Sequence, residues 1–221
     1  MPAGPGPVDG VVLVMHGGKE SSREPTSATS LPVVRMRPFA RALEAGRGTH
    51  RFVVWSVRFR VRGWNGDEMS PVADVRQALE QVRVAHGDVP VVLVGHSMGG
   101  RAALRAAGGA ARTVVALAPW LPAGEPFAQL DGCQVLIVHG SSDRVTSPRR
   151  SREFATEAAA VADRVWWVEM RGSGHAMVRR ARRWHELTSE FVLSALAGEA
   201  MPDVLDTGTA RATTGPVVLS I

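Results

Sequence analysis

The sequence places a serine between two glycines in the stretch GHSMG, residues 95–99. Apolar residues precede this stretch and helix-forming residues follow it, so the serine falls on a turn between a strand and a helix. The pattern G-x-S-x-G in that context is typical of a turn that lifts a serine hydroxyl above a sheet edge. Glycine on either side avoids crowding, and the helix N-terminus directs N–H groups toward an anion. We therefore predict that Ser97 is a nucleophile, with a plain helix-capping turn as the alternative.

A serine hydroxyl is a weak nucleophile unless a base takes its proton and an acid orients that base. Two later loops supply both groups: Asp143 follows the apolar run 133–140, and His175 follows the run RVWWVEM. Both loops would leave carboxyl ends of strands, where open α/β sheets bind their ligands. The chain order Ser97, Asp143, His175 therefore predicts a catalytic triad, with Glu125 as the alternative acid.

An acyl-transfer site also needs backbone N–H groups that stabilise the oxyanion. We predict that Met98, directly after the nucleophile, supplies one of them. Gly18 in the stretch MHGGKE, residues 15–20, would supply the other, with Lys19 as the alternative. A phosphate-binding P-loop is excluded, because its spacing would require a glycine where the chain has Leu13.

Several other residues stand next to these positions in the sequence. Trp120, Leu121, Val145 and Met177 neighbour the triad positions and could line an acyl pocket, with ordinary core packing as the alternative. His16 and His139 end apolar runs just before glycines, and we expect each to position a loop by hydrogen bonding. His96 lies inside the turn and should point away from the serine hydroxyl.

The elements that must position these residues are short apolar runs separated by helical segments. The runs lie at 10–17, 51–59, 89–96, 113–119 and 133–140, followed by RVWWVEM. Most are continuously apolar, which favours strands buried on both faces of a parallel sheet. The sequence therefore predicts an α/β fold: a doubly wound, mostly parallel sheet of about six strands with helices on both faces.

The chain divides into a predicted domain at residues 1–198 and a C-terminal tail at 199–221. The tail has no helical period, and its end, PVVLSI, is predicted either to pair as an edge strand or to be mobile. Residues 18–32 form a long polar loop, a kind of segment that is often functional.

Composition narrows the function classes. The 221 residues include 45% hydrophobic and 21% charged residues, as expected for a globular domain. The net charge of +5 comes with acids and arginines interspersed, so no nucleic-acid partner is predicted. Cys133 is the single cysteine, which excludes an intrachain disulfide. With no signal peptide and no apolar run long enough to span a membrane, a cytoplasmic protein is expected.

Four motifs together resemble the α/β-hydrolase superfamily: HGG at 16–18, GHSMGG at 95–100, HGSSD at 139–143 and GSGH at 172–175. In such folds a strand pair usually precedes the first of these motifs, and the seven residues available here leave no room for it. Only 13 residues separate Pro119 from Cys133, so the resemblance is to small members without a cap.

The resemblance implies a serine hydrolase, most often an esterase, lipase, thioesterase or lactonase. The expected reaction is cleavage of a small-molecule ester or thioester through an acyl-enzyme intermediate. The resemblance implies no cofactor, and the sequence suggests no metal site. The alternatives are a biosynthetic thioesterase or acyltransferase, and a non-catalytic binding protein on the same fold.

Overall fold

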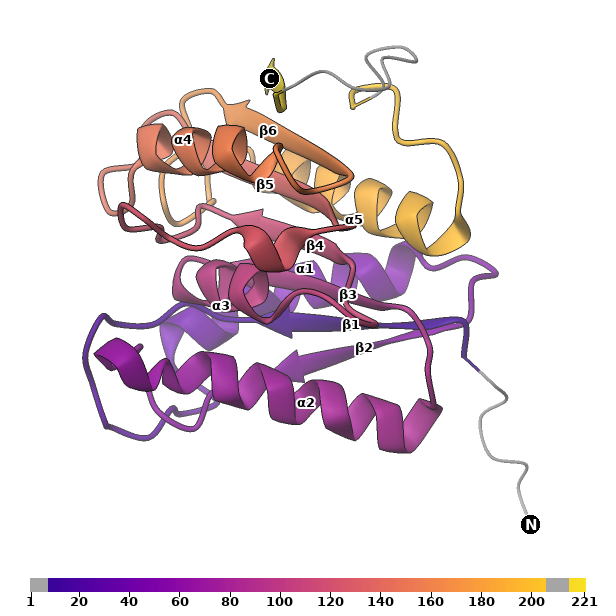
Figure 1. The fold of residues 1–221 in the computed structure, drawn as a ribbon, viewed down its shortest axis with the longest axis horizontal. Helices are drawn as coiled ribbons and strands as arrows, with labels where there is room; N and C mark the ends of the chain where they lie inside the picture. The colour runs from indigo at the N-terminus through magenta and orange to yellow at the C-terminus, as the bar shows by residue number, and fades with distance from the viewer. Residues whose placement is uncertain (1–7, 206–214) are drawn as a thin grey trace.

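The computed structural model describes residues 8–205 and 215–221. Its seven strands form a single sheet in the order β2-β1-β3-β4-β5-β6-β7, and every neighbouring pair is parallel (Figure 1). The strands are β1 (Gly10–Met15), β2 (Phe52–Val57), β3 (Val91–His96), β4 (Thr113–Leu117), β5 (Gln134–Gly140), β6 (Arg164–Met170) and β7 (Val217–Ser220). The predicted doubly wound α/β sheet is confirmed, with one strand more than expected and no antiparallel pair within the described residues.

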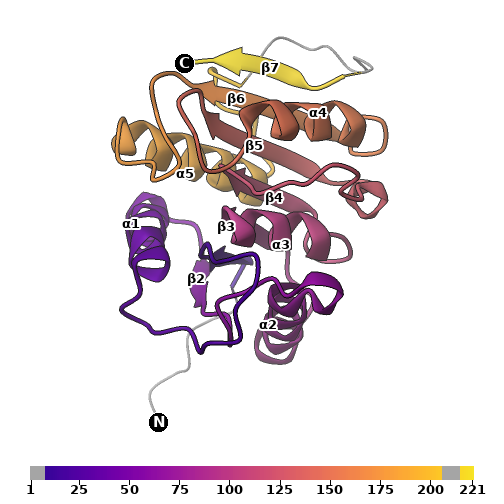
Figure 2. The same cartoon turned by 90° about the vertical axis from the view of Figure 1, so that its left-hand side faces the viewer.

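Five helices cover the two faces of this sheet. Helices α1 (Leu31–Gly46) and α5 (Ala181–Ala197) pack together on one face, as Figure 2 shows. Helices α2 (Ser70–His86), α3 (Met98–Ala106) and α4 (Pro148–Ala158) cover the other face. Two short 3₁₀ helices, η1 (Gly66–Glu68) and η2 (Ala128–Leu130), lie in the connections.

The central strands are apolar throughout because both of their faces are buried. Along β1, Val11, Leu13 and Met15 join the core under α2 and α3, whereas Val12 and Val14 join the core under α1 and α5. All six β1 residues are buried, as are all six of β3. This two-sided packing explains why the runs show no strand-like alternation of polar and apolar residues.

The carboxyl ends of all seven strands lie at one edge, which faces the viewer in Figure 2. Two long connections at this edge are joined to each other by isolated bridges, Lys19 with Gly63 and Pro25 with Val61. The connection from β4 to β5 contains only η2, so no cap formed by the described residues covers this edge of the sheet.

The C-terminal segment returns to the sheet. Strand β7 pairs with β6 and forms the edge of the sheet opposite β2. Of the predicted tail, residues 206–214 lie outside the described residues, as do residues 1–7 of the predicted domain. The division of the chain at residue 198 therefore stays a prediction. Within the described residues, no helix has the length and apolar character needed to cross a membrane.

Candidate active site

Ser97 sits on the turn between β3 and α3 with a backbone conformation that side chains rarely adopt, φ 54° and ψ −118°. The close packing around the turn depends on glycine. A Cβ at Gly95 would collide with the backbone of Gly99, and one at Gly99 with the carbonyl oxygen of His16. Because Met98 is the first residue of α3, the N-terminus of that helix begins directly beside the serine.

The Ser97 hydroxyl is hydrogen-bonded to a histidine that is in turn held by a carboxylate. Ser97 Oγ lies 3.1 Å from His175 Nε2, and His175 Nδ1 donates to Asp143 Oδ2 over 2.8 Å. Asp143 follows β5 and His175 follows β6, so two loops at the same sheet edge bring the side chains together. The three residues predicted from their chain order thus form one hydrogen-bonded chain.

The Asp143 carboxylate is buried and surrounded by donors. Burial alone would raise its pKa, but hydrogen bonds from His139, His175 and the backbone N–H groups of Thr146 and Val145 have the opposite effect. The net result is a pKa well below the usual range for an aspartate. Asp143 is therefore ionised at neutral pH, as an acid that orients a histidine must be.

A second histidine reaches the same carboxylate oxygen. His139 is fully buried, with Nε2 3.2 Å from Asp143 Oδ2 and Nδ1 2.8 Å from Ser151 Oγ. The Ser151 hydroxyl donates to the carbonyl of Pro148 and accepts from the indole N–H of Trp167. The two ring nitrogens of His139 are thus held by Ser151 on one side and by the Asp143 carboxylate on the other.

Thr146 completes this network, and sequence reasoning missed its role. Its hydroxyl lies 2.8 Å from Asp143 Oδ2 and 3.1 Å from His175 Nδ1. The threonine hydroxyl donates to the carboxylate, and its oxygen lies close to the Nδ1–H group of His175. The signal available in the sequence was proximity alone, since Thr146 follows Asp143 by three residues.

The two predicted oxyanion donors have free backbone N–H groups. Among the described residues, neither Gly18 nor Met98 donates its N–H to a protein acceptor. The alternative donor is excluded, because the Lys19 N–H is bound to the carbonyl of Arg62 over 2.8 Å. A Cβ at Gly18 would collide with the Met98 side chain and with Arg62 O, so this position requires glycine.

His16 fixes the orientation of the peptide that carries one of these donors. Its Nε2 accepts the N–H of Phe59 over 3.1 Å, so the ring proton is on Nδ1, which donates to Gly17 O over 2.7 Å. Burial lowers the pKa of His16 and favours this neutral form. Since the C=O and N–H of a peptide point in opposite directions, the Gly18 N–H is held facing away from His16.

His96 ties the serine turn to the histidine loop. Its Nε2 donates to the carbonyl of His175 over 2.9 Å, and the two rings lie 4.7 Å apart. Burial, with a smaller contribution from His175, lowers the pKa of His96 to about 3. The ring therefore stays neutral and does not compete with His175 for the proton of the serine.

The alternative acid, Glu125, forms ion pairs with two arginines of α3. Its carboxylate is almost fully buried and pairs with Arg101 at 2.7 Å and with Arg105 at 3.3 Å. The Arg101 guanidinium also stacks on Trp64 and Trp120, 3.8 Å and 4.7 Å from their ring centres. This cluster holds the connection after β4 against α3, and Glu125 has no contact with His175.

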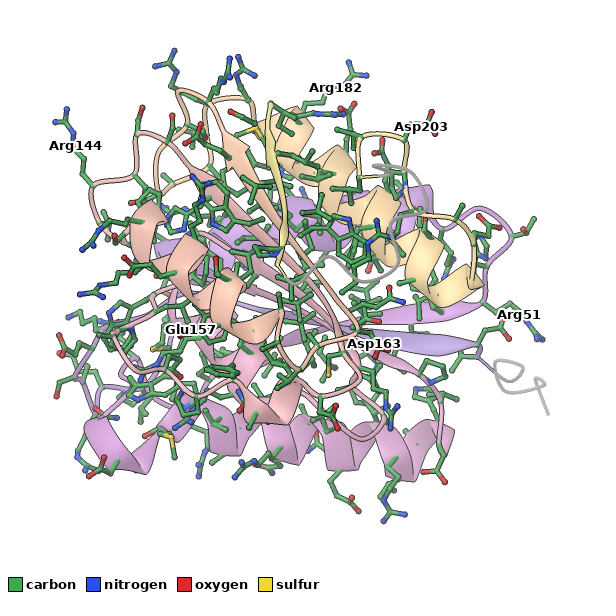
Figure 3. The ribbon with its side chains drawn as sticks, turned by 45° about the horizontal axis from the view of Figure 1, so that its top comes forward. Arg51, Arg144, Glu157, Asp163, Arg182 and Asp203 are labelled. Atoms are coloured by element: carbon green, nitrogen blue, oxygen red, sulfur yellow. The ribbon has the colours of Figure 1, made fainter. Side chains whose placement is uncertain are left out.

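The four residues predicted to line an acyl pocket do not share one environment. Trp120 is partly buried in the arginine stack, whereas Leu121 and Met177 are buried in the two opposite halves of the core. The Val145 side chain is 72% exposed, and only its backbone N–H reaches Asp143. The neighbouring Arg144 projects from this loop into solvent (Figure 3). These four residues are close to the triad in the sequence, but they do not line one common cavity.

A cavity of about 270 Å³ opens instead beside the oxyanion loop. Its walls come from the end of β1, the connection to α1 and the connection after β2. They are formed by His16, Gly17, Gly18, Lys19, Thr26, Ser30, Leu31, Pro32 and Arg62. The long polar loop 18–32 was the only part of this wall that the sequence indicated as functional. Elsewhere in the described residues, no group of three or more His, Cys, Asp or Glu side chains could hold a metal ion.

A sequence model of the alpha/beta hydrolase family matches residues 11–133. No curated protein sequence matches the chain. Among solved structures, a putative α/β hydrolase of unknown function from Agrobacterium tumefaciens is 16% identical, with a TM-score of 0.66 over 87% of this chain and 88% of that one.

Two further solved structures lie at similar distance. A serine hydrolase without a lid from Xanthomonas campestris is 22% identical, with a TM-score of 0.61 over 91% of this chain and 86% of that one. A propionate-bound esterase from Thermogutta terrifontis is 20% identical, with a TM-score of 0.63 over 89% of this chain and 86% of that one. The TM-scores support a common fold, and the Xanthomonas campestris protein shares with the described residues of this chain the absence of a lid.

Proposed function

The chain belongs to the alpha/beta hydrolase family, and from this premise we propose that it is a serine hydrolase acting on carboxylic esters or thioesters. The observation that carries the proposal is the hydrogen-bonded chain from Ser97 Oγ through His175 to Asp143. The free N–H groups of Gly18 and Met98 beside the serine add the donors that a tetrahedral intermediate needs.

In the proposed mechanism, Ser97 Oγ attacks the carbonyl carbon of the ester while His175 Nε2 takes the hydroxyl proton. The carbonyl oxygen becomes an oxyanion held by the N–H groups of Met98 and Gly18. Collapse of this intermediate breaks the ester bond, and His175 returns the proton to the leaving alcohol or thiol. Water then attacks the acyl-serine by the same steps and releases the acid.

Asp143 acts on the reaction through His175. Its carboxylate fixes the imidazole in the tautomer that accepts at Nε2 and stabilises the imidazolium that forms. His139 and Thr146 hold the same carboxylate oxygen that binds His175. Their hydrogen bonds favour the charged form of Asp143, in line with its lowered pKa.

The open carboxyl edge favours short and medium acyl groups. No cap is present to enclose a single ligand, so we expect activity on several esters and no activation at lipid surfaces. The neighbouring esterase that binds propionate and butyrate is consistent with small acyl groups at such a site.

A fluorophosphonate probe tests the proposal directly, because it phosphonylates only an activated serine. We expect the wild-type chain to be labelled at residue 97 and to hydrolyse 4-nitrophenyl butyrate. Ser97→Ala should lose the label and lose on the order of 10⁶-fold in kcat, as removal of a triad serine does. Circular dichroism should show the fold unchanged.

Ser194→Ala on α5 is the matched control, and it should be labelled like the wild type. Turnover retained by purified Ser97→Ala would contradict the proposal. An unlabelled wild-type chain would favour the non-catalytic binding protein. If added alcohols captured the acyl group faster than water did, the acyltransferase would be the better description.

A further inference from the structure

The cavity beside the oxyanion loop adjoins the reacting serine. Gly17 forms part of its wall, and a Cβ on that glycine would lie 3.2 Å from Cβ of Ser97. Gly18, the predicted oxyanion donor, is the next residue of the same wall. A group bound in this cavity would therefore belong to the molecule whose carbonyl lies at Ser97, which links the cavity to the proposed function.

Lys19 brings an unpaired positive charge to this wall. It is the single lysine of the chain, and its backbone is fixed by hydrogen bonds to Arg62 O and from the Trp64 N–H. Its ammonium group, in contrast, has no hydrogen bond or ion pair with any described residue. A held backbone with a free charged end is the arrangement expected of a side chain that meets a ligand.

Two further donors in the same wall lack acceptors. Arg62 donates from Nη1 to Glu24, but its Nε is buried and unpartnered within the described residues. The hydroxyl oxygen of Thr26 is likewise buried without a partner. A buried polar group left without a hydrogen bond is unfavourable, so such donors are available to an acceptor supplied from outside.

Arg35 adds a second unpaired cation close by. It follows Leu31, a residue of the cavity wall, by one turn on the same face of α1. The side chain is half-buried, and it forms no ion pair with a described residue. Burial lowers the pKa of Arg35, and its charge is one of the smaller causes that lower the pKa of His96 beneath Ser97.

Of the two acidic residues in this stretch of the wall, Glu20 is exposed and forms no ion pair with a described residue, whereas Glu24 is already paired. Glu24 is bound by Arg62 at 2.7 Å, and neither Lys19 nor Arg35 shares it. Some other arginines have carboxylate partners of their own, as Arg23 has in Glu68 and Arg51 has in Asp9. Lys19 and Arg35 form no such pair with a described residue, so both charges are available to a ligand in the cavity.

We propose that this cavity binds an anionic group, a carboxylate or a phosphate, that the ester substrate carries. Lys19 and Arg35 supply the opposite charge, and Arg62 Nε and the Thr26 hydroxyl supply hydrogen bonds. Charge-assisted hydrogen bonds of this kind are about twice as strong as neutral ones. The proposal rests on the serine hydrolase activity proposed above and names the class of ester on which that activity acts.

Matched pairs of esters test this preference on both sides of the scissile bond. Monoethyl adipate against ethyl hexanoate varies charge on the acyl side, and 2-acetoxyethyl phosphate against 2-acetoxyethanol varies it on the alcohol side. The wild type should show kcat/KM at least about tenfold higher for the charged member of one pair. This ratio corresponds to about 1.4 kcal/mol of additional binding free energy in the transition state. The preferred pair identifies the side and the anion.

Charge-removing variants connect the preference to the cavity. Lys19→Gln and Arg35→Gln should each lower the charged-to-neutral ratio of kcat/KM by about tenfold. Arg41→Gln, on the exposed face of the same helix, is the matched control and should leave the ratio unchanged. Added salt should also reduce the ratio, because these side chains reach solvent.

Equal kcat/KM for charged and neutral esters in the wild type would overturn the anion site. So would a ratio that Lys19→Gln and Arg35→Gln leave unchanged. Calorimetry of monoethyl adipate and of inorganic phosphate with Ser97→Ala separates this failure from failure of the proposed function. Binding that depends on Lys19 and Arg35 supports the cavity even where no ester is turned over, and an absence of binding to either anion contradicts it.

Discussion

The two ends of the sheet differ in a way that cavity size does not reveal. At the amino end, a depression of about 460 Å³ lies between the connections that enter β3 and β4. The cavity at the carboxyl end measures about 270 Å³. Yet the larger depression is lined by no histidine, serine or cysteine, whereas the carboxyl end gathers Ser97, Asp143 and His175. The volume of a cavity therefore does not identify the end of the sheet at which the candidate active site lies.

The backbone shows the same contrast. All six non-glycine residues with positive φ among the described residues lie in connections that leave carboxyl ends of strands: Asn65, Met69, Ser97, Ala118, Met177 and Arg180. The connections at the amino end place only glycines in that conformation, at Gly48, Gly87, Gly108, Gly109 and Gly132. Glycine adopts positive φ without steric penalty, whereas other residues are destabilised by about 1–3 kcal/mol.

This difference in backbone conformation shows that the fold tolerates backbone strain at the carboxyl end of the sheet. The amino end connects helices to strands with relaxed turns, and the carboxyl end accepts unfavourable backbone in order to aim particular side chains. Helix direction acts in the same sense, since α3 presents its N-terminus at the carboxyl end, beside Ser97. Substitutions at the two ends should therefore have very different effects on turnover.

The largest effect at the carboxyl end is expected from Asp143→Asn. The amide would be nearly isosteric but could not hold His175 in the required tautomer, so kcat should fall by about 10⁴-fold. Steady-state hydrolysis of 4-nitrophenyl butyrate measures this change. Glu125→Gln is the matched control, and its loss should be far smaller. If Glu125→Gln were the crippling change, the acid would have been assigned to the wrong strand end.

A smaller effect is expected from Gly18→Ala. The added methyl group would meet the Met98 side chain and Arg62 O, which displaces the oxyanion donor. Loss of one such donor lowers kcat by about 10²–10³-fold. Gly66→Ala, where a Cβ meets no atom within 4 Å but φ is +60°, controls for backbone strain from the loss of a glycine in a carboxyl-end connection. Turnover unchanged in Gly18→Ala would remove this loop from the oxyanion site.

The smallest effect should come from the amino end. Ala110→Trp would fill part of the depressions there, since Ala110 is exposed and lines both of them. We expect kcat/KM to stay within about twofold of the wild type, as for most surface substitutions. A large loss of activity in a folded Ala110→Trp protein would show that the two ends are coupled and would break the comparison.

Local patterns in the sequence were sufficient for the residues that follow strand ends. The serine turn, the aspartate and the histidine each come after a buried apolar run, and parallel strands place all such points at one edge. The choice between Asp143 and Glu125 could not be made in this way, because both follow strands. It depends on the packing of Arg101 against Glu125, a contact between residues 24 positions apart.

The residues that line the cavity could not be predicted from the sequence for a similar reason. The cavity forms where residues 19–26 pair with residues 60–64. Neither segment has a periodic pattern of apolar residues that would predict this pairing. The expected acyl-pocket residues were chosen by adjacency to the triad, but Met177 and Leu121 turn toward the core instead. His139 was expected to position a loop, and only the structure shows that it contacts the Asp143 carboxylate itself.

The backbone of Ser97 sets two selection pressures against each other. In its conformation a glycine would be relaxed, so the side chain that performs the proposed chemistry is also one that the fold would be more stable without. A lineage selected for thermal resistance alone would gain by losing this serine, whereas one selected for turnover must retain it and the strain together. Under the proposed function, a homologue with glycine at this position would have exchanged turnover for stability.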